Sequence, residues 1–366
     1  MELFNTHVSP VSVDLMKKVL ESRRLSEGDT VRQFEEALTQ KLGIVNPVAV
    51  NSGTSALHLA LAIAGVKPGD EVILPAQTFV ASGLSIMMQF ARPVFADIKL
   101  KTGNIDADSI RRKINQYTRA IMPVHWGGYP CDMDEINAIA DEYNLAVIED
   151  AAHAIGAEYR GKSVGSLSPR FTAFSFQAIK HLTTGDGGLL SCLRAEDYNE
   201  ARKRRWFGID RAQSELSLLG ERQYDITEVG YKYHMNNIAA AIGLGNLSDF
   251  HQRLKRRQQI GNRYQRELRG VPGLELLDIG DDRTHAYWLF TMLVEGRIDF
   301  INKLGEYAIP ASVVHQRIDR YSVFGGVREE LENQAVFDQR QISIPVHEAL
   351  TDEEVDKIIR VIRSGW

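Results

Sequence analysis

The sequence predicts an α/β fold in which a mostly parallel, seven-stranded sheet carries helices on both faces, followed by a smaller C-terminal α+β domain. Between residues 46 and 195, short apolar runs alternate with helix-like segments, as in a parallel sheet. After residue 245 the alternation gives way to a long amphipathic segment. A chain of 366 residues also exceeds a typical single domain. We therefore expect a large domain at 1–245 and a small domain at 246–366, with the N-terminal segment a candidate to pack on the small domain.

Seven apolar runs are the predicted strands of the large domain: Val48–Asn51, Glu71–Pro75, Pro93–Asp97, Ala120–Val124, Leu145–Asp150, Thr172–Phe176 and Gly188–Cys192. Between them, Ser55–Ala64 and Asp132–Tyr143 have the apolar spacing and end signals of helices. In the small domain we expect a helix over Asn246–Arg269, strands at 286–294 and 341–345, and a closing helix from Thr351. Ligands of such sheets bind beyond the carboxyl ends of the strands.

Composition narrows the function classes. The formal net charge of −5 gives no global reason to bind nucleic acid or an anionic membrane. No apolar run approaches the length of about 20 residues that a membrane span needs, and the N-terminus lacks the apolar core of a signal peptide. The two cysteines, Cys131 and Cys192, have no metal-binding spacing. We expect a cytoplasmic enzyme without a metal.

A lysine follows one of the predicted strands. In the segment 174–188 an apolar strand leads to Lys180, and a glycine-rich turn and another strand come next. By itself, Lys180 could be a solvated loop residue. Packing explains a lysine at this place poorly, however, and an amine whose surroundings lower its pKa can form a Schiff base.

Two other strand ends carry complementary groups. Asp150 ends the strand 145–150, where its carboxylate could either cap a helix or face a protonated ring nitrogen. The segment 50–58 runs from a strand through Gly53, Thr54 and Ser55 into a helix, whose amides and hydroxyls could hold a phosphate or serve only as a cap. An anion cradle, a carboxylate and a lysine thus occur in order at the ends of one sheet.

These segments resemble the DegT-type sugar aminotransferases, which use pyridoxal phosphate (PLP) and have PLP fold type I. The family patterns N-S-G-T-x-A-L, E-D-A-A-[QH] and S-F-x-x-x-K-x-L-x-x-G-[ED]-G-G occur at 51–57, 149–153 and 175–188. The resemblance covers roughly residues 25–350. It implies that Gly53, Thr54 and Ser175 hold the phosphate, with Ser55 in the same cradle. It also implies the roles of residues around the ring: Phe79 stacks on it, Asp150 pairs with its nitrogen, His153 approaches its hydroxyl and Lys180 forms the Schiff base.

Two further segments resemble the family with substitutions. Residues 230–238 follow the pattern G-Y-N-Y-R-M, which in relatives reaches a partner subunit's phosphate, but Lys232 replaces its asparagine and His234 its arginine. Lys232 is therefore a candidate phosphate ligand across a homodimer interface. In the segment 314–321, His315 stands where relatives place a substrate-facing histidine. Arg317 and Arg320, which the pattern lacks, could grip an anionic group of the substrate.

Two further segments match phosphate-binding patterns, but each is better explained as an ordinary structural element. Residues 156–163 match the Walker A pattern letter for letter, but no apolar strand immediately precedes them and no good helix follows, so we expect a hairpin-like turn. The run Arg202–Arg205 could meet the phosphates of a sugar nucleotide, but such runs are more often a solvated helix face.

The resemblance implies transfer of an amino group from L-glutamate to a nucleotide-linked keto-sugar. Alternatives stay open. Some relatives are PLP-dependent sugar dehydratases, in one group of which histidine replaces the lysine; here His181 is the next residue. A lyase or an aminotransferase of a non-sugar keto substrate is also compatible with the unusual 315–321 segment. A non-catalytic regulatory protein on the same scaffold would need a broken cofactor site.

Overall fold

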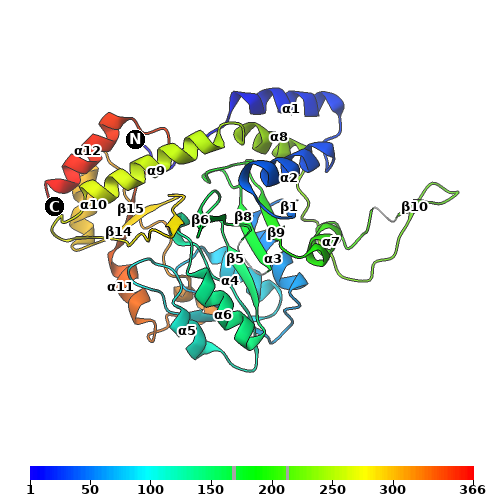
Figure 1. The fold of residues 1–366 in the computed structure, drawn as a ribbon, viewed down its shortest axis with the longest axis horizontal. Helices are drawn as coiled ribbons and strands as arrows, with labels where there is room; N and C mark the ends of the chain where they lie inside the picture. Colours follow the sequence, from blue (N-terminus) through cyan, green and yellow to red (C-terminus); the bar gives the residue numbers. More distant parts are fainter. Residues whose placement is uncertain (167–169, 212–213) are drawn as a thin grey trace.

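The computed structural model describes residues 1–166, 170–211 and 214–366. Its centre is a seven-stranded sheet with the strand order β1-β9-β8-β5-β4-β2-β3 (Figure 1). The strands are β1 (Pro47–Val50), β2 (Glu71–Pro75), β3 (Arg92–Ala96), β4 (Thr118–Ile121), β5 (Ala146–Asp150), β8 (Phe171–Ser175) and β9 (Gly188–Cys192). Among these seven, β9 runs antiparallel to both of its neighbours, β1 and β8, and the other neighbouring pairs are parallel. The predicted sheet is confirmed.

Helices cover both faces of the sheet because neighbouring strand residues bury opposite sides. On β2, Val72 and Leu74 pack into one core cluster and Ile73 into another. The first cluster lies under α3 (Gly53–Ile63), α4 (Val80–Met88) and α7 (Ala195–Arg204). The second lies under α5 (Ala107–Lys113) and α6 (Met133–Tyr143).

The C-terminal part has a sheet of its own. The antiparallel strands β12 (Leu274–Leu276), β14 (Phe290–Val294) and β15 (Gln341–Ile344) pack beside α9 (Phe250–Glu267), α10 (Arg297–Glu306), α11 (Glu332–Arg340) and α12 (Asp352–Arg363). The expected strand 286–294 is shorter because the amides of Ala286 and Leu289 donate to Gly128 and Gly127 instead. Thr351 and Glu354 form a capping box at the start of α12.

The expected continuous helix Asn246–Arg269 was wrong at its start. Asn246 is the last residue of α8 (Asn237–Asn246), and α9 begins at Phe250. The buried Asn246 side chain accepts from the amide of Ser9 at 2.7 Å and donates to the carbonyl of Thr183 at 2.9 Å. The domain boundary that we propose, between residues 245 and 246, falls at the last residue of α8.

The N-terminal segment contacts both the sheet-containing large part and the C-terminal part of the chain. α1 (Pro10–Ser22) packs on α8, and α2 (Asp29–Leu42) packs on α8 and β1. Ahead of α1, Asn5 donates to Glu348 at 3.3 Å, and the carbonyl of Glu2 accepts from His347 at 3.0 Å. The first residues therefore contact the C-terminal part.

The segment with the Walker A pattern is a hairpin. β6 (Glu158–Tyr159) and β7 (Lys162–Ser163) pair antiparallel, and β13 (Arg283–Thr284) joins them. Arg160 and Gly161 in the turn have φ of 50° and 73°, as a two-residue hairpin turn requires. The expected turn is confirmed, and no helix begins here to cradle a phosphate.

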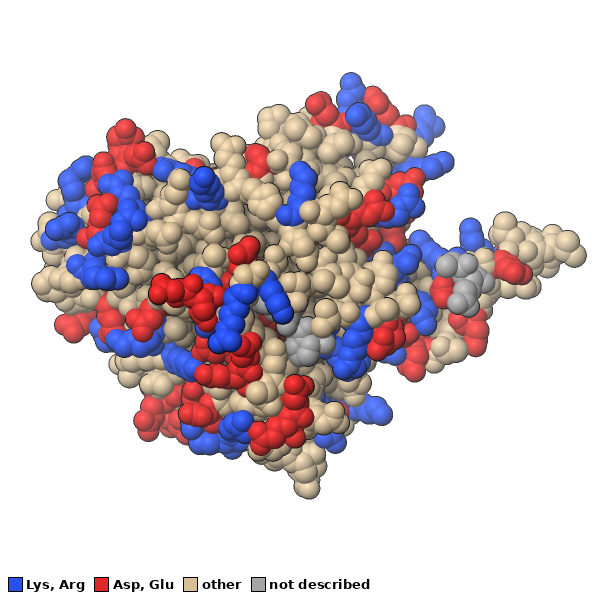
Figure 2. Space-filling model, viewed as in Figure 1, with Lys and Arg blue, Asp and Glu red and all other residues tan. Residues whose placement is uncertain are grey.

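A second hairpin projects from the body of the protein as an arm (Figure 1). It carries β10 (Glu215–Leu216) and β11 (Arg222–Gln223), and its tip exposes Leu218 and Leu219. Figure 2 shows acidic and basic side chains interspersed over the visible face, whereas the tip of the arm is largely uncharged. In the part of the chain that is described, no helix is both long and apolar enough to cross a membrane.

Candidate active site

A cavity of about 390 Å³ lies where β5 and β8 end and where α3 and α4 begin. Its position is the one expected for the ligand site of a parallel sheet. The described lining residues include eight that the sequence predicted: Gly53, Thr54, Phe79, Asp150, His153, Ser175, Lys180 and His315. Residues up to 262 positions apart in the sequence, Gly53 and His315, thus meet in one cavity.

One end of the cavity is the N-terminus of α3, where free amides favour an anion. Ser52 caps the helix by accepting from the amide of Ser55 at 3.0 Å. A Cβ added to Gly53 would lie 3.0 Å from the Cβ of Ser175, so a larger residue here would crowd Ser175. Ser55 does not line the cavity; its hydroxyl donates to Asn51 at 2.6 Å and helps to fix the turn.

Asp150 is buried at the end of β5 and supplies the cavity with a fixed carboxylate. One of its oxygens accepts from the hydroxyl of Ser82 at 2.7 Å, and the other accepts from the amide of Ala152 at 3.1 Å. These two bonds leave further acceptor positions on each oxygen. The carboxylate can therefore pair with a cation inside the cavity.

The Lys180 amine lies 3.5 Å from the centre of the Trp288 ring. Its separation from bulk water lowers the pKa of Lys180 to about 7, although the charge of Asp150 acts in the opposite direction. Burial penalises the charged form of an amine. Near neutral pH a large fraction of Lys180 is thus unprotonated and nucleophilic.

This pKa predicts a pH profile for amine reactivity. Because the free base is the reactive form, labelling of Lys180 should rise as pH passes through about 7 and then level off, whereas an ordinary surface lysine should titrate near about 10.4. Trace acetylation of the cofactor-free protein, read by peptide mass spectrometry, measures both sites. The exposed Lys162 in the β6–β7 hairpin is the internal control. A Lys180 midpoint close to that of Lys162 would contradict a lowered pKa.

Three aromatic rings stack along one wall of the cavity. His153 lies 3.8 Å from Trp288 between ring centroids, and His315 lies 5.7 Å from each of them. Burial holds the pKa of His153 well below its usual value and lowers that of His315 to about 3, so both rings are neutral. The Nδ1 atom of His153 and the Nε2 atom of His315 are buried without a hydrogen-bond partner among the described residues. Both atoms can bond to a polar ligand.

Phe79 stands at the opening of the cavity. It precedes α4, its side chain is 53% exposed, and its ring lies 5.2 Å from that of His315. A half-exposed aromatic ring at the edge of a cavity offers a flat apolar face to a planar ligand.

Besides Ser55, three predicted residues lie outside this cavity. Lys232 places its amine 4.3 Å from the centre of the Trp206 ring. Arg317 is buried, and its guanidinium donates to Asp319 at 2.7 and 2.6 Å and to the carbonyl of Arg328 at 3.0 Å. Arg320 is exposed in the short 3₁₀ helix Ile318–Arg320. In the chain as described, neither arginine is brought to the cavity.

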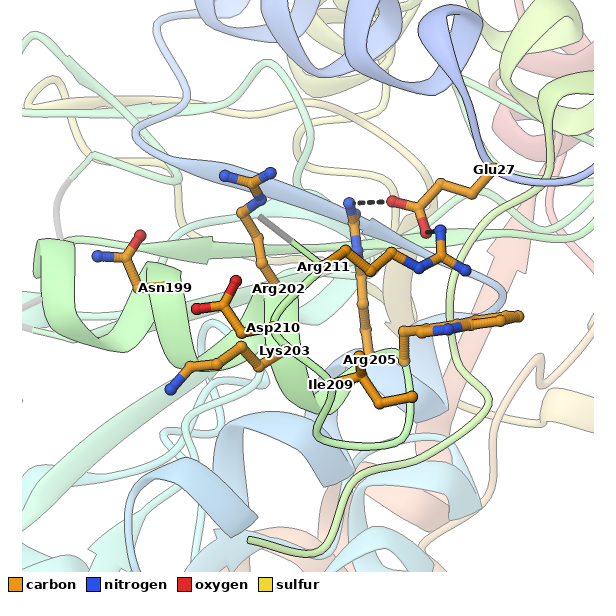
Figure 3. Close-up of a pocket in the computed structure, with 9 residues that line it drawn as sticks. Glu27, Asn199, Arg202, Lys203, Arg205, Ile209, Asp210 and Arg211 are labelled. Atoms are coloured by element: carbon orange, nitrogen blue, oxygen red, sulfur yellow. Dashed lines mark hydrogen bonds and ion pairs between the residues drawn. The ribbon is translucent and has the colours of Figure 1, made fainter. Parts of the chain in front are cut away.

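The run Arg202–Arg205 borders a second pocket, of about 420 Å³ (Figure 3). Arg205 is buried and forms ion pairs with Glu27 and Glu35, both at 2.6 Å. Lys203 pairs with Glu200 at 2.9 Å, whereas Arg202 is exposed. Much of the positive charge of this run is therefore already paired within the chain.

The sequence did not reveal Trp288 or Ser82 as parts of the site. Trp288 lies about a hundred residues beyond Lys180, in a segment that the sequence marked only as a strand. The sequence around Ser82 resembles that of any helical serine, and only the position of α4 in the fold brings its hydroxyl to Asp150. Trp288 is one of two tryptophans in 246–366, the other being Trp366, and a tryptophan in a predicted strand fits core packing equally well.

A lysine amine of lowered pKa, a buried carboxylate and a helix N-terminus that surround one cavity define a PLP enzyme of fold type I. The residues present fit the cofactor: the unpartnered Nδ1 of His153 suits its ring hydroxyl, and Gly53 leaves room at the phosphate end. Comparison with known proteins identifies the family. The model of the DegT/DnrJ/EryC1/StrS aminotransferase family matches residues 10–363, and the chain belongs to this family of PLP-dependent sugar aminotransferases.

Three similar proteins illustrate the relationship. GDP-perosamine synthase of Caulobacter vibrioides is 35% identical over 92% of this chain and 90% of its own length. The sugar aminotransferase CalS13 of Micromonospora echinospora has a TM-score of 0.95 and 36% identity, with both chains fully covered. The PLP form of Spr1654, a sugar aminotransferase from Streptococcus pneumoniae described as putative, has a TM-score of 0.91 and 27% identity over 100% of this chain and 98% of that one.

Proposed function

We propose that the protein transfers an amino group from L-glutamate to a keto-sugar carried on a nucleotide, as a step of amino-sugar biosynthesis. The observation that carries the proposal is the single cavity that unites Lys180, Asp150 and His153. Family membership supports the sugar as the acceptor class. The similarity to GDP-perosamine synthase, whose name includes a nucleotide, supports a nucleotide-linked acceptor.

We propose a separate role in the reaction for each of the main cavity residues. PLP, when bound, supplies an aldehyde that an amine can attack and a ring that withdraws electrons. The unprotonated Nζ of Lys180 can take the proton from the Cα of the amino donor and deliver it to the aldehyde carbon of the cofactor, acting first as base and then as acid. Asp150, which lines the cavity, would hold a positive charge at the ring nitrogen, while Phe79 and His153 would fix the orientation of the ring.

The wall of the cavity favours proton transfer over side reactions with water. Trp288 and His315 are largely buried, and Trp288 is held in place because its Nε1 donates to the carbonyl of Ile179 at 3.0 Å. A dry wall beside Lys180 keeps its amine unprotonated and keeps bulk water from the reacting carbon. We propose His315, with its unpartnered Nε2, as a contact to the sugar.

We propose a homodimer whose active sites lie at the interface. The described lining residues contain no arginine and one lysine, Lys180, whereas the cofactor phosphate and glutamate both bring negative charge. The amine of Lys232 forms no hydrogen bond or ion pair with the described residues; it lies over the ring of Trp206 and does not line the cavity of its own chain. The exposed leucines of the β10–β11 arm also need a cover. A second copy would answer both needs.

We propose that Arg317 and Arg320 contact an anionic group of the substrate. An anion would have to displace Asp319 to reach Arg317, whereas Arg320 is exposed. We also propose a reducing compartment such as the cytoplasm, because Cys131 and Cys192 are buried and free.

The alternatives have less support. In the dehydratase reading a histidine would take the place of the lysine, but here Lys180 faces the cavity and the adjacent His181 donates to the carbonyl of Ala286 at 2.8 Å. A non-catalytic scaffold would have no use for an amine of lowered pKa beside a buried carboxylate. No observation favours a non-sugar acceptor over a sugar.

The proposed donor predicts a spectroscopic result. Mixing the PLP-loaded protein with excess L-glutamate should remove its visible absorbance band, produce a near-ultraviolet band and release an equimolar amount of 2-oxoglutarate in a single turnover. Stopped-flow absorbance and an assay of the keto acid measure both. D-glutamate is the matched control, because it presents the same charges with the opposite hand. A spectrum that ignores L-glutamate would refute this donor and point to another amine or to a lyase.

A further inference from the structure

A buried carboxylate, that of Glu149, lies behind the cofactor site on the other face of β5, where it forms a cluster with His125 and Thr172. Glu149 and Asp150 are consecutive strand residues, so their side chains point to opposite faces of the sheet. Asp150 faces the cavity, whereas Glu149 is fully buried and does not line it. The reaction as described so far makes no use of Glu149.

The hydrogen bonds of Glu149 show which groups carry protons. One oxygen accepts from the Thr172 hydroxyl at 2.8 Å, and the other lies 2.8 Å from the Nε2 of His125. The Nδ1 of His125 accepts from the amide of Cys131 at 3.0 Å, so the ring proton must be on Nε2. His125 is therefore neutral and donates to Glu149. Both oxygens of Glu149 face groups that can donate, an arrangement that suits the carboxylate form.

Such an arrangement is costly if its purpose is only structural. A fully buried carboxylate whose two bonded partners are neutral loses its hydration without gaining a counter-charge. Glutamine would fill the same space at lower cost and could still accept from His125. We therefore expect the negative charge of Glu149, and not only its shape, to have a function.

The same cluster is tied to the backbone of Asp150. The amide of Asp150 donates to the carbonyl of Pro123 at 2.9 Å, and its carbonyl accepts from the amide of His125 at 3.1 Å. In the register of β5 with β8, Glu149 is opposite Thr172 and Asp150 is opposite Ala173. The groups that hold Glu149 thus also hold the strand end that carries Asp150.

We propose that Glu149 is a positioning residue of the cofactor site, a second anion that acts from behind the sheet together with Asp150 to keep a proton on the cofactor's ring nitrogen. This inference rests on the proposed cofactor site, but not on the identity of the substrate. The low dielectric constant of a buried sheet lets the charge act through it. A unit charge roughly 10 Å away, at an effective dielectric constant of about 20, changes a proton-binding constant about tenfold.

The test reads the ring nitrogen directly. The protein is loaded with PLP labelled with ¹⁵N in the ring, and its nitrogen resonance is followed against pH for the wild type, Glu149→Gln, Thr172→Val and Asp150→Asn. Thr172→Val is the matched control, because it removes one hydrogen bond from Glu149 and keeps the charge. Asp150→Asn shows how far the resonance moves when the direct partner is lost. Thermal unfolding of each cofactor-free variant reports stability separately.

We expect Glu149→Gln to weaken proton binding at the ring nitrogen about tenfold, Thr172→Val to leave it nearly unchanged, and Asp150→Asn to have the largest effect. If Glu149→Gln matches the wild type while Asp150→Asn shifts, Glu149 is only structural and the inference falls. If Thr172→Val shifts as much as Glu149→Gln, geometry rather than charge is responsible, which also overturns it. A protein that binds PLP but ignores L-glutamate would refute the proposed donor and leave this measurement intact.

Discussion

Replacing Lys180 by alanine should slow the glutamate half-reaction by at least about a thousandfold, which is the upper part of the range for losing a positioned acid–base group. The variant keeps Asp150, His153 and the N-terminus of α3, so it should still bind the cofactor, though more weakly. It lacks the one amine among the described lining residues that can move the proton from the donor's Cα to the aldehyde carbon of the cofactor. Single-turnover absorbance with saturating PLP and L-glutamate measures the rate.

Two further variants serve as controls for the Lys180→Ala result. Lys180→Arg keeps a positive charge but cannot lose its proton near neutral pH, so it should be as slow as the alanine variant. Lys162→Ala removes an exposed lysine from the β6–β7 hairpin and should leave the rate unchanged. If the rate of Lys180→Ala stays within about tenfold of the wild type, another base moves the proton, and the assignment of Lys180 fails.

Part of the site could be predicted because some of its residues stand at the ends of strands. The sheet requires Asp150 and Ser175 at the carboxyl ends of β5 and β8, and the motifs around them are local in sequence. Once the strands are paired in the right order, these residues meet without further information. The same reasoning places Gly53, because a larger residue at the turn from β1 into α3 would crowd Ser175.

The residues that could not be predicted depend on contacts between distant segments. Trp288 reaches the cavity because residues 286–289 bond to the 127–128 turn instead of extending β14. The break between α8 and α9 depends on Asn246, whose side chain bonds to Ser9 and Thr183. Local periodicity contains none of these partners. A helix-like pattern therefore ran through 246–249 in the sequence, although the chain turns there.

Replacing Lys232 should have a large effect on PLP affinity, because we propose that its amine binds the cofactor phosphate of the partner subunit. Removing a charged hydrogen-bond donor from the cofactor phosphate costs about 1.5–3 kcal/mol, or roughly 10–100-fold in PLP affinity. Lys232→Ala should therefore bind PLP weakly and be nearly inactive at low cofactor concentration. Lys232→Arg, which keeps the charge, should recover much of the affinity.

Mixed dimers separate a contact within one chain from a contact across the interface. In a dimer of one Lys180→Ala chain and one Lys232→Ala chain, purified through two different tags, the second chain keeps its own Lys180. If Lys232 acts across the interface, that chain also receives an intact Lys232 from its partner, and about half of the wild-type activity should return at low PLP because one of two symmetric sites is complete. If Lys232 acts within its own chain, each site lacks one of the two lysines and the mixed dimer stays as inactive as its parents. Recovery would place the missing positive charge of the cavity on the partner subunit, since the described lining of a single chain offers no cation besides Lys180.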